Sequence, residues 1–152
     1  MEPKVPLEIL GLLRRRVDPD EYRAIRQLWV AHSIAEDGRD IPGLMATLTE
    51  DCVYTIVNKE VDWHGKAGAT RFYTQLLTSF PDIHFDLQNI VIGPQGVFEE
   101  AYVTGTYEAQ WLDLPAPDGQ HIEFNVTILF PWDPNQKLFS GERIYFYLHG
   151  AA

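Results

Sequence analysis

The pattern of apolar and polar positions divides the chain into a helical first half and a strand-forming second half. Up to Phe80, apolar residues recur mostly every three or four positions, the period of a helix with one buried face. From Ile83 onward they alternate with polar residues, as in a strand. Helices are predicted over 5–17, from an N-cap at Asp18 to just before Gly38, over 42–48 and over 66–79. Strands are predicted over 52–57, 84–92, 97–110, 121–132 and 137–148. Helices followed by strands indicate an α+β fold.

Short turns between the long strands predict an antiparallel meander. The segments 93–96, 114–119 and 133–136 are rich in Gly, Pro, Asp and Asn, which favour tight turns. A long, twisted sheet of this kind curls around three helices into a cone, and we expect its open end to form a small-molecule pocket. The last strand carries large residues on both faces, with Arg143 and Tyr145 on one and Ile144 and Phe146 on the other. We therefore expect a homodimer through the outer face of the sheet.

The composition fits a globular protein with an acidic surface. The length of 152 residues predicts one domain, with a core over 18–148 and a helical extension over 1–17. The net charge of −10 disfavours binding to nucleic acid and to anionic membranes. One cysteine, Cys52, excludes an internal disulfide, and its place in an apolar strand predicts an inert thiol. No targeting or membrane-spanning segment is visible, so we expect a soluble, cytoplasmic protein.

A series of short motifs runs from Trp63 to Tyr147. They are His-Gly-Lys-Ala-Gly-Ala at 64–69, Phe-Pro-Asp at 80–82, Thr-Gly-Thr-Tyr at 104–107, Leu-Asp-Leu-Pro-Ala-Pro-Asp-Gly at 112–119 and Glu-Arg-Ile-Tyr-Phe at 142–146. In this order and spacing they resemble the SnoaL-like polyketide cyclase family of the nuclear transport factor 2-like superfamily. The resemblance implies three N-terminal helices packed on a strongly curved, mainly antiparallel sheet, a cone also called cystatin-like. It also implies that catalytic relatives use an acidic residue in the pocket, without metal or cofactor.

The sequence departs from the family pattern where that acid is expected. Many relatives end the last strand with Asp, but Tyr147 stands here, and Ile128 takes the place of an acid on the preceding strand. Whether the protein is an enzyme therefore stays open. One hypothesis is a cyclase, isomerase or hydratase acting on an apolar, aromatic or polyketide-like compound. The alternative is a non-catalytic ligand-binding or accessory protein. A third, a protein-interaction module like the transport factor itself, has no marked peptide groove to support it.

Three residues are candidates for catalysis. His32 lies on a helical stripe with Trp29, where a histidine is either a base near neutral pH or a structural residue. Tyr147 is either a hydrogen-bond donor to a developing oxyanion or a core tyrosine. Arg143 shares a strand face with Tyr145 and Tyr147. Inside the cone it would hold an anionic substrate, and outside it would pair with surface acids.

The aromatic residues near the expected pocket suit a flat apolar ligand. Candidate ligand-binding residues are Trp29, Tyr54, Asn58, Trp63, Tyr73, Tyr107 and Tyr145. Tyr54 and Asn58 share parity, so we expect them to face the same way. The five histidines lack a metal-ligand spacing and no glycine-rich phosphate loop is present, so we expect neither a metal nor a cofactor.

Overall fold

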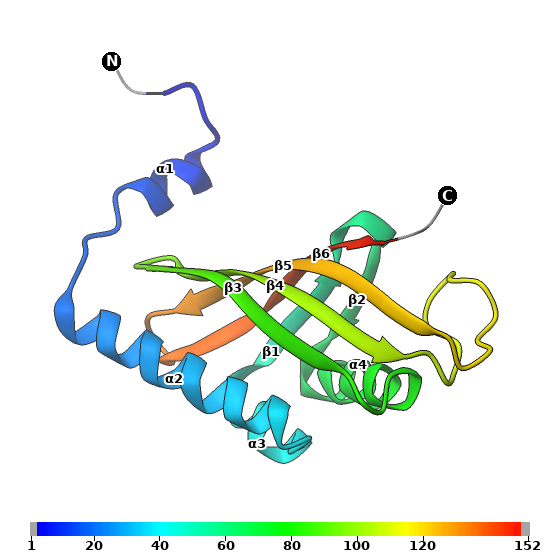
Figure 1. Ribbon diagram of the computed structural model, residues 1–152. Coiled ribbons are helices and arrows are strands. Elements are labelled where there is room, and N and C mark those ends of the chain that lie inside the picture. Colours follow the sequence, from blue (N-terminus) through cyan, green and yellow to red (C-terminus); the bar gives the residue numbers. More distant parts are fainter. Residues whose placement is uncertain (1–2, 150–152) are drawn as a thin grey trace.

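The computed structural model describes residues 3–149, so the first two residues of the predicted extension lie outside the described part. Its largest element is a curved six-stranded sheet in the order β2-β1-β6-β5-β4-β3 (Figure 1). The strands are β1 Leu48–Ile56, β2 Val61–His64, β3 His84–Gly93, β4 Gly96–Thr106, β5 His121–Asp133 and β6 Leu138–Leu148. Strands β3 to β6 form the predicted antiparallel meander, whereas β1 pairs with β6 in parallel. The α+β cone is confirmed.

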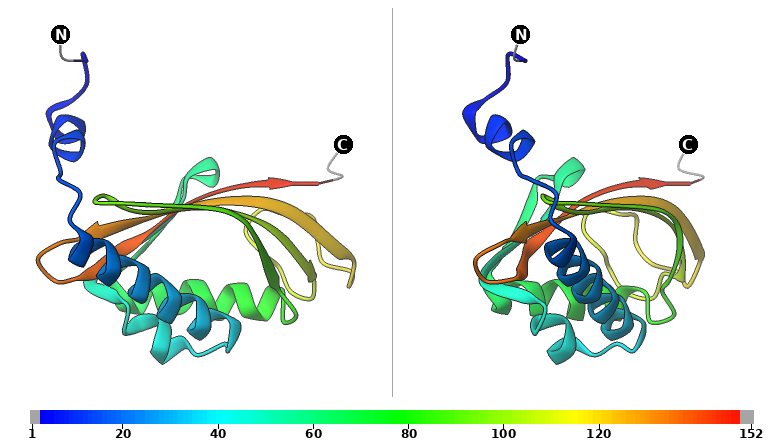
Figure 2. Two further views of the ribbon diagram at one scale, coloured as in Figure 1. Left: turned by 60° about the vertical axis from the view of Figure 1, so that its left-hand side comes forward. Right: turned by 90° about the vertical axis from the view of Figure 1, so that its left-hand side faces the viewer.

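Three helices cover the concave face of the sheet (Figure 2). They are α2 Pro19–Asp37, α3 Ile41–Met45 and α4 Gly65–Ser79. The predicted start of α2 is confirmed, because the Asp18 carboxylate accepts hydrogen bonds from the backbone N–H groups of Asp20 and Glu21 at 2.9 Å. Helix α1, Leu7–Leu13, lies apart from these three, on the other side of the sheet (Figure 2). None of the helices in the described part of the chain is long and apolar enough to cross a membrane.

Several predicted boundaries were wrong. The helix predicted over 5–17 covers only Leu7–Leu13, and the strand predicted over 52–57 begins at Leu48. No element was predicted between that strand and the helix over 66–79, where the structure has the 3-10 helix η1 Val57–Lys59 and strand β2, whose four residues are too few to show an alternating pattern. The strand predicted over 97–110 ends at Thr106. Tyr107 N–H still donates to Gln120 O at 2.9 Å, in register with β5, but Glu108 N–H donates to Ser79 O at 2.8 Å and so leaves the ladder. The chain then forms the loop that borders the open end of the cone.

A glycine sets the register between the two parallel strands. The pairing of β1 with β6 shifts between Leu48 and Val53, and Gly141 occupies the shift on β6 with φ of +128°. A Cβ atom at Gly141 would lie 1.9 Å from Val53 O, so only glycine allows this approach. Directly after it, Glu142 pairs with Tyr54. The glycine thus places a carboxylate of β6 beside a phenol of β1.

Candidate functional site

A narrow, mostly apolar cavity lies between α4 and the concave face of the sheet. Its empty space is about 580 Å³, including the open mouth. Side chains of α4, β3, β5 and β6 form the walls, together with Trp111 and Leu114 from the loop after β4. The only polar residues among those lining it are Glu36 and Glu142. An apolar slot with a few convergent polar groups is the usual form of a small-molecule site.

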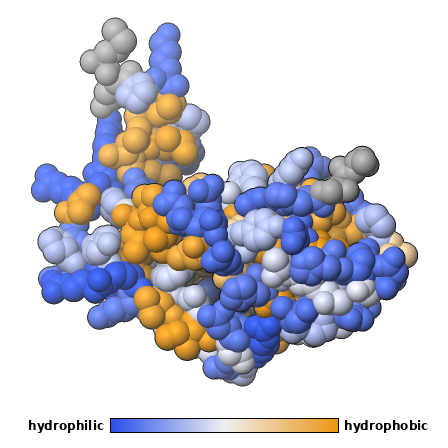
Figure 3. Space-filling model, in the orientation of Figure 1, coloured by the Kyte–Doolittle hydropathy of each residue, from blue (hydrophilic) through white to orange (hydrophobic). Residues whose placement is uncertain are grey.

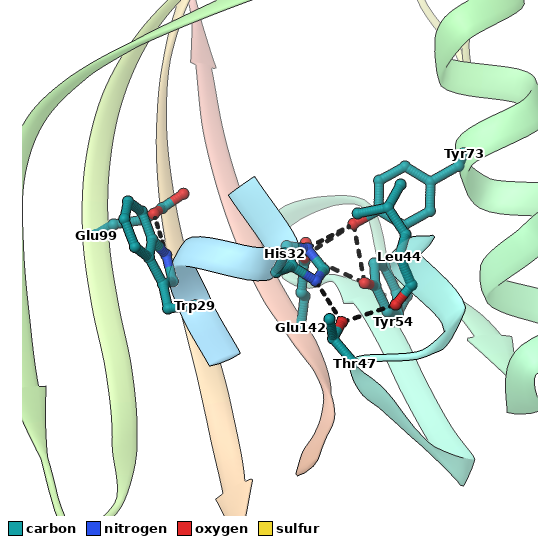
Figure 4. Close-up of polar contacts among 8 residues, drawn as sticks. All are labelled: Trp29, His32, Leu44, Thr47, Tyr54, Tyr73, Glu99 and Glu142. Carbon is teal, nitrogen blue, oxygen red and sulfur yellow. Dashed lines mark hydrogen bonds and ion pairs between the residues drawn. The ribbon is translucent and has the colours of Figure 1, made fainter. Parts of the chain in front are cut away.

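Glu142 is the centre of a buried polar cluster at the inner end of this cavity (Figure 4). The Glu142 side chain is 3% exposed, and its Oε1 atom lies 3.0 Å from His32 Nε2. The same oxygen accepts hydrogen bonds from Tyr73 OH at 3.0 Å and Tyr54 OH at 3.2 Å. The two phenols also contact each other at 2.9 Å. Four residues from α2, β1, α4 and β6 therefore meet at one carboxylate oxygen.

The hydrogen bonds of Thr47 fix the tautomer of His32. Thr47 Oγ1 donates to the backbone oxygen of Leu44 at 2.7 Å, so its one hydrogen is already used. It must then accept from His32 Nδ1, which lies 2.7 Å away. Nδ1 carries a hydrogen, and Nε2 is the ring atom that can gain or lose a proton beside Glu142. His32 and Glu142 thus form a pair that can share one proton between Nε2 and Oε1.

The two tyrosines act as donors in this cluster. Burial and, after it, the negative charge of Glu142 raise the pKa of Tyr54 and that of Tyr73 well above the ordinary phenol range. Both phenols therefore stay protonated at neutral pH. They hold Oε1 of Glu142 in place and can donate to negative charge that develops on it.

Two further carboxylates make the region strongly acidic. Glu36 lies one helical turn after His32 on α2, and burial followed by the charges of Glu142 and Glu99 raises its pKa well above the usual range. On β4, Glu99 accepts a hydrogen bond from Trp29 Nε1 at 2.9 Å (Figure 4). Burial and the charge of Glu142 raise the pKa of Glu99 to about 7. Burial and the mutual repulsion of the carboxylates thus raise the pKa of both Glu36 and Glu99.

The same atoms have the spacing of a cation site. His32, Glu36 and Glu142 each offer one ligand atom, and these atoms lie within 4.8 Å of one another. Nitrogen and carboxylate oxygen are suitable ligands for a divalent transition metal. Because Nε2 of His32 and Oε1 of Glu142 contact each other at 3.0 Å, a metal and the shared proton would compete for the same positions. This arrangement therefore supports proton transfer or metal binding, but not both at once.

The predicted site residues of β6 lie on the wrong face for the cavity. Tyr147 is 72% exposed, Tyr145 is 46% exposed, and Arg143 is also exposed, all on the outer side of the sheet. Side chains alternate along a strand, so the even-numbered residues from Glu142 to Leu148 face the cavity instead. Tyr145 and Tyr147 therefore do not face the cavity as expected, and Arg143 adopts the outer of its two expected positions.

Asn58 also lies outside the cavity. It is exposed in η1, where its side chain donates to Phe146 O at 3.0 Å and accepts from Phe146 N–H at 3.3 Å. The shared parity of Tyr54 and Asn58 failed as a guide because β1 ends at Ile56, after which the alternation stops. Asn58 instead links η1 to the backbone of β6 at Phe146.

The other predicted residues occupy different parts of the cone. His32, Tyr54 and Tyr73 come together in the cluster, and Trp29 contacts Glu99. Trp63 is buried and stacks on Trp111, with ring centroids 6.4 Å apart. Tyr107 stacks on Phe80, and its hydroxyl accepts from Trp111 N–H at 3.1 Å. Trp63 and Tyr107 do not line the cavity themselves, but pack against Trp111 and Phe80, which do.

Sequence reasoning missed the acids of the site. Glu142, Glu36 and Glu99 were not among the candidates, and neither was Thr47, which orients His32. Two patterns point to the first two. Glu142 alternates in phase with the apolar residues of β6, and Glu36 stands four positions after His32 on α2. Glu99 likewise alternates in phase with the buried residues Val97, Ala101 and Val103 of β4, whereas its contact with Trp29 joins distant segments and has no local signal.

Comparison with known proteins finds one matching domain family and several solved structures of similar fold. A family described as SnoaL-like domain matches residues 27–137. No curated protein matches. A solved structure proposed to be a SnoaL-like polyketide cyclase, from Shewanella denitrificans, is 15% identical with a TM-score of 0.69, covering 86% of this chain and 92% of its own. A proposed polyketide cyclase from Xanthomonas campestris is 21% identical with a TM-score of 0.66, covering 82% and 91%. AclR, proposed to be a hydroxylase, from Streptomyces galilaeus, is 16% identical with a TM-score of 0.65, covering 86% and 92%. At these identities the likeness concerns the fold.

Proposed function

Because the chain belongs to the SnoaL-like domain family, we propose that its cavity binds a small apolar or aromatic molecule and performs a cofactor-free acid/base step on it. The observation that carries the proposal is the carboxylate of Glu142 at the inner end of an apolar cavity, with its Oε1 atom 3.0 Å from the unprotonated Nε2 of a histidine whose tautomer is fixed. Cyclisation, isomerisation and hydration all need a group that takes a proton at one atom and returns it at another. Glu142, beside His32, can take the proton, and Glu36, the other acid that lines the cavity, can return one.

We assign a part to each group from its place in the cavity. The apolar walls hold the substrate and exclude water, which strengthens the electrostatic effect of the few polar atoms. Glu142 takes a proton from an acidic carbon, and His32 Nε2 stabilises the resulting pair by sharing that proton. A protonated Glu36, at the cavity wall, returns a proton to the product. Since no cationic residue lines the cavity in the described part of the chain, the site selects substrates without negative charge.

Proton exchange on an enolisable aromatic ketone tests this proposal without knowledge of the natural substrate. We expect the protein to accelerate exchange of the α-protons of 2-tetralone in D₂O, followed by NMR. We expect Glu142→Gln to reduce the exchange rate about 100-fold, the size of a typical general-base contribution. Tyr147→Phe is the matched control, because this phenol is exposed on the outer face and should leave the rate unchanged.

The same experiment separates the two proposed functions. Ligand binding without catalysis is favoured by Ile128, an apolar side chain in the cavity where many relatives carry an acid. Binding of 2-tetralone without any acceleration of exchange would contradict the enzyme and support the binding protein. Equal acceleration by Glu142→Gln and the unaltered protein would contradict the role of Glu142.

We also propose that this single-domain protein is cytoplasmic and forms a homodimer through the outer face of the sheet. Val91 is 58% exposed and Phe98, its partner on β4, is 45% exposed, on the same face as Tyr145 and Tyr147. An exposed apolar face of this kind favours association with a second copy. We expect light scattering at about 10 µM to give the mass of a dimer, since interfaces of standard size usually hold at this concentration. Tyr147→Glu should shift that mass to the monomer, and a monomeric unaltered protein would contradict the proposal.

A further inference from the structure

Helix α1 exposes its large apolar side chains to solvent. It contains no buried residue, and Leu7 is 81% exposed and Leu13 60% exposed. Val17, in the link to α2, is 78% exposed. Figure 3 shows hydrophobic surface gathered over this helix. A helix of seven residues is not stable alone in water, so its order depends on contacts with something else.

Hydrogen bonds join the C-terminal end of α1 to the turn between β3 and β4 of the same chain. Gln95 Nε2 donates to Leu12 O at 2.8 Å, and Arg15 Nη1 donates to Pro94 O at 3.2 Å. These contacts join the arm, defined as residues 3–17, to the turn between β3 and β4. From there α1 projects on the side of the sheet away from α3 and α4 (Figure 2). The arm thus stands on the same side as the exposed outer face of the sheet.

The charges identify the kind of surface that the arm fits. Residues 1–17 contain four basic and two acidic residues, a net charge of +2, which leaves −12 on residues 18–152. On the outer face the exposed acid Glu100 lies two positions from the exposed Phe98 on β4, and the exposed acid Asp86 lies further along β3. A basic arm with leucines complements such a face in both charge and polarity. An anionic membrane would attract the arm but repel the much more acidic body.

We propose that α1 docks on the outer sheet face of a second copy of this chain and clasps the dimer. The inference rests on the homodimer proposed above. In a two-fold dimer each chain gives one arm and receives one, so the leucines of both arms leave solvent. The contacts at Leu12 and Arg15 hold each arm in the direction of the partner and reduce the entropy lost on docking.

Sedimentation of a dilution series tests the clasp in the full chain. We expect the double variant Leu7→Glu/Leu13→Glu to raise the dimer dissociation constant at least tenfold, because two leucines lose their apolar cover. Ile34→Glu is the matched control, since Ile34 is 67% exposed on α2 and should leave the constant unchanged. Tyr147→Glu tests the sheet face itself. An unchanged constant for the double variant, with Tyr147→Glu monomeric, would overturn the clasp and leave the dimer standing.

Cross-linking between two differently tagged chains gives a second readout. We expect mixed chains carrying Leu13→Cys and Phe98→Cys to form a disulfide between copies under mild oxidation. Ile34→Cys in place of Leu13→Cys should not. A disulfide confined to a single chain carrying both substitutions would overturn the clasp, because the arm would then cover its own sheet. Loss of binding to phosphatidylserine vesicles by Leu7→Glu/Leu13→Glu, with dimerisation intact, would also overturn it and assign the arm to a membrane.

Discussion

Gly141→Ala will lower the free energy of unfolding by about 2 to 6 kcal/mol. The residue has φ of +128°, a region that costs a residue with a Cβ atom about 1–3 kcal/mol. The new Cβ would also lie 1.9 Å from Val53 O and 2.8 Å from Val53 N, which are backbone atoms that cannot turn away. Strands β1 and β6 must then separate, at a further cost of about 1–3 kcal/mol. Urea unfolding followed by tryptophan fluorescence measures the change.

Gly119→Ala separates the two causes. Gly119 also has a positive φ, of +78°, but a Cβ atom there would meet nothing within 4 Å. We expect this control to cost only about 1–2 kcal/mol, the price of the backbone conformation alone. An equal loss for both variants would show that the approach of β1 to β6 is not what requires glycine. Because Glu142 follows Gly141 directly, Gly141→Ala should also disturb the contact between Glu142 and Tyr54.

The protein will become less stable as the pH rises from about 5 to about 7. In the folded state the pKa of Glu99 is about 7, whereas its ordinary value is 4.5. Between these values the folded protein holds a proton that the unfolded chain has released, so unfolding releases it and stability falls with rising pH. The difference corresponds to up to about 3 kcal/mol for this one group, and the raised pKa of Glu36 acts in the same direction. Urea unfolding at pH 5, 6, 7 and 8 measures the slope.

Glu99→Gln should remove much of this slope and stabilise the protein at pH 8. The amide keeps an acceptor for Trp29 Nε1 but carries no charge that burial would penalise. Glu100→Gln removes a charge from the exposed face of the same strand and controls for net charge. Trp29→Phe should raise the pKa of Glu99 further and make the slope steeper, because it removes the hydrogen bond that lowers this pKa. A slope that survives Glu99→Gln undiminished would contradict the assignment.

Local patterns predicted the helices and the meander because their causes are local. The N-cap at Asp18 and the stop before Gly38 follow from side-chain chemistry within a few residues, and both agree with the bounds of α2. The alternation from Ile83 onward likewise follows from one buried face per strand. The parallel pairing of β1 with β6 had no such signal, since it joins segments almost 90 positions apart. Strand β2 was missed because four residues carry too little pattern.

The candidate site was predicted only in part, because some of its residues have a local signal and their contacts with one another do not. His32, Tyr54 and Tyr73 were identified because buried polar aromatics on predicted core faces are conspicuous. Tyr147 was chosen because relatives carry an acid at its place, and Arg143 because it shares a strand face with Tyr147. The phase of the strand places both on the outer face. That phase was available in the alternation of β6, whose apolar side includes Glu142. Which groups meet at Glu142, in contrast, depends on packing between four separate elements.

The distances along the chain between the residues of the polar cluster have a consequence for folding kinetics. Glu142 is separated by 110 positions from His32 and by 88 from Tyr54. Closing such long loops is entropically slow, so contacts of this kind form late and lower the folding rate. During synthesis the cluster can assemble only after β6 has left the ribosome. Occupancy of the cavity by a ligand would therefore mark chains that have finished folding, and partly folded chains would have no competent binding site.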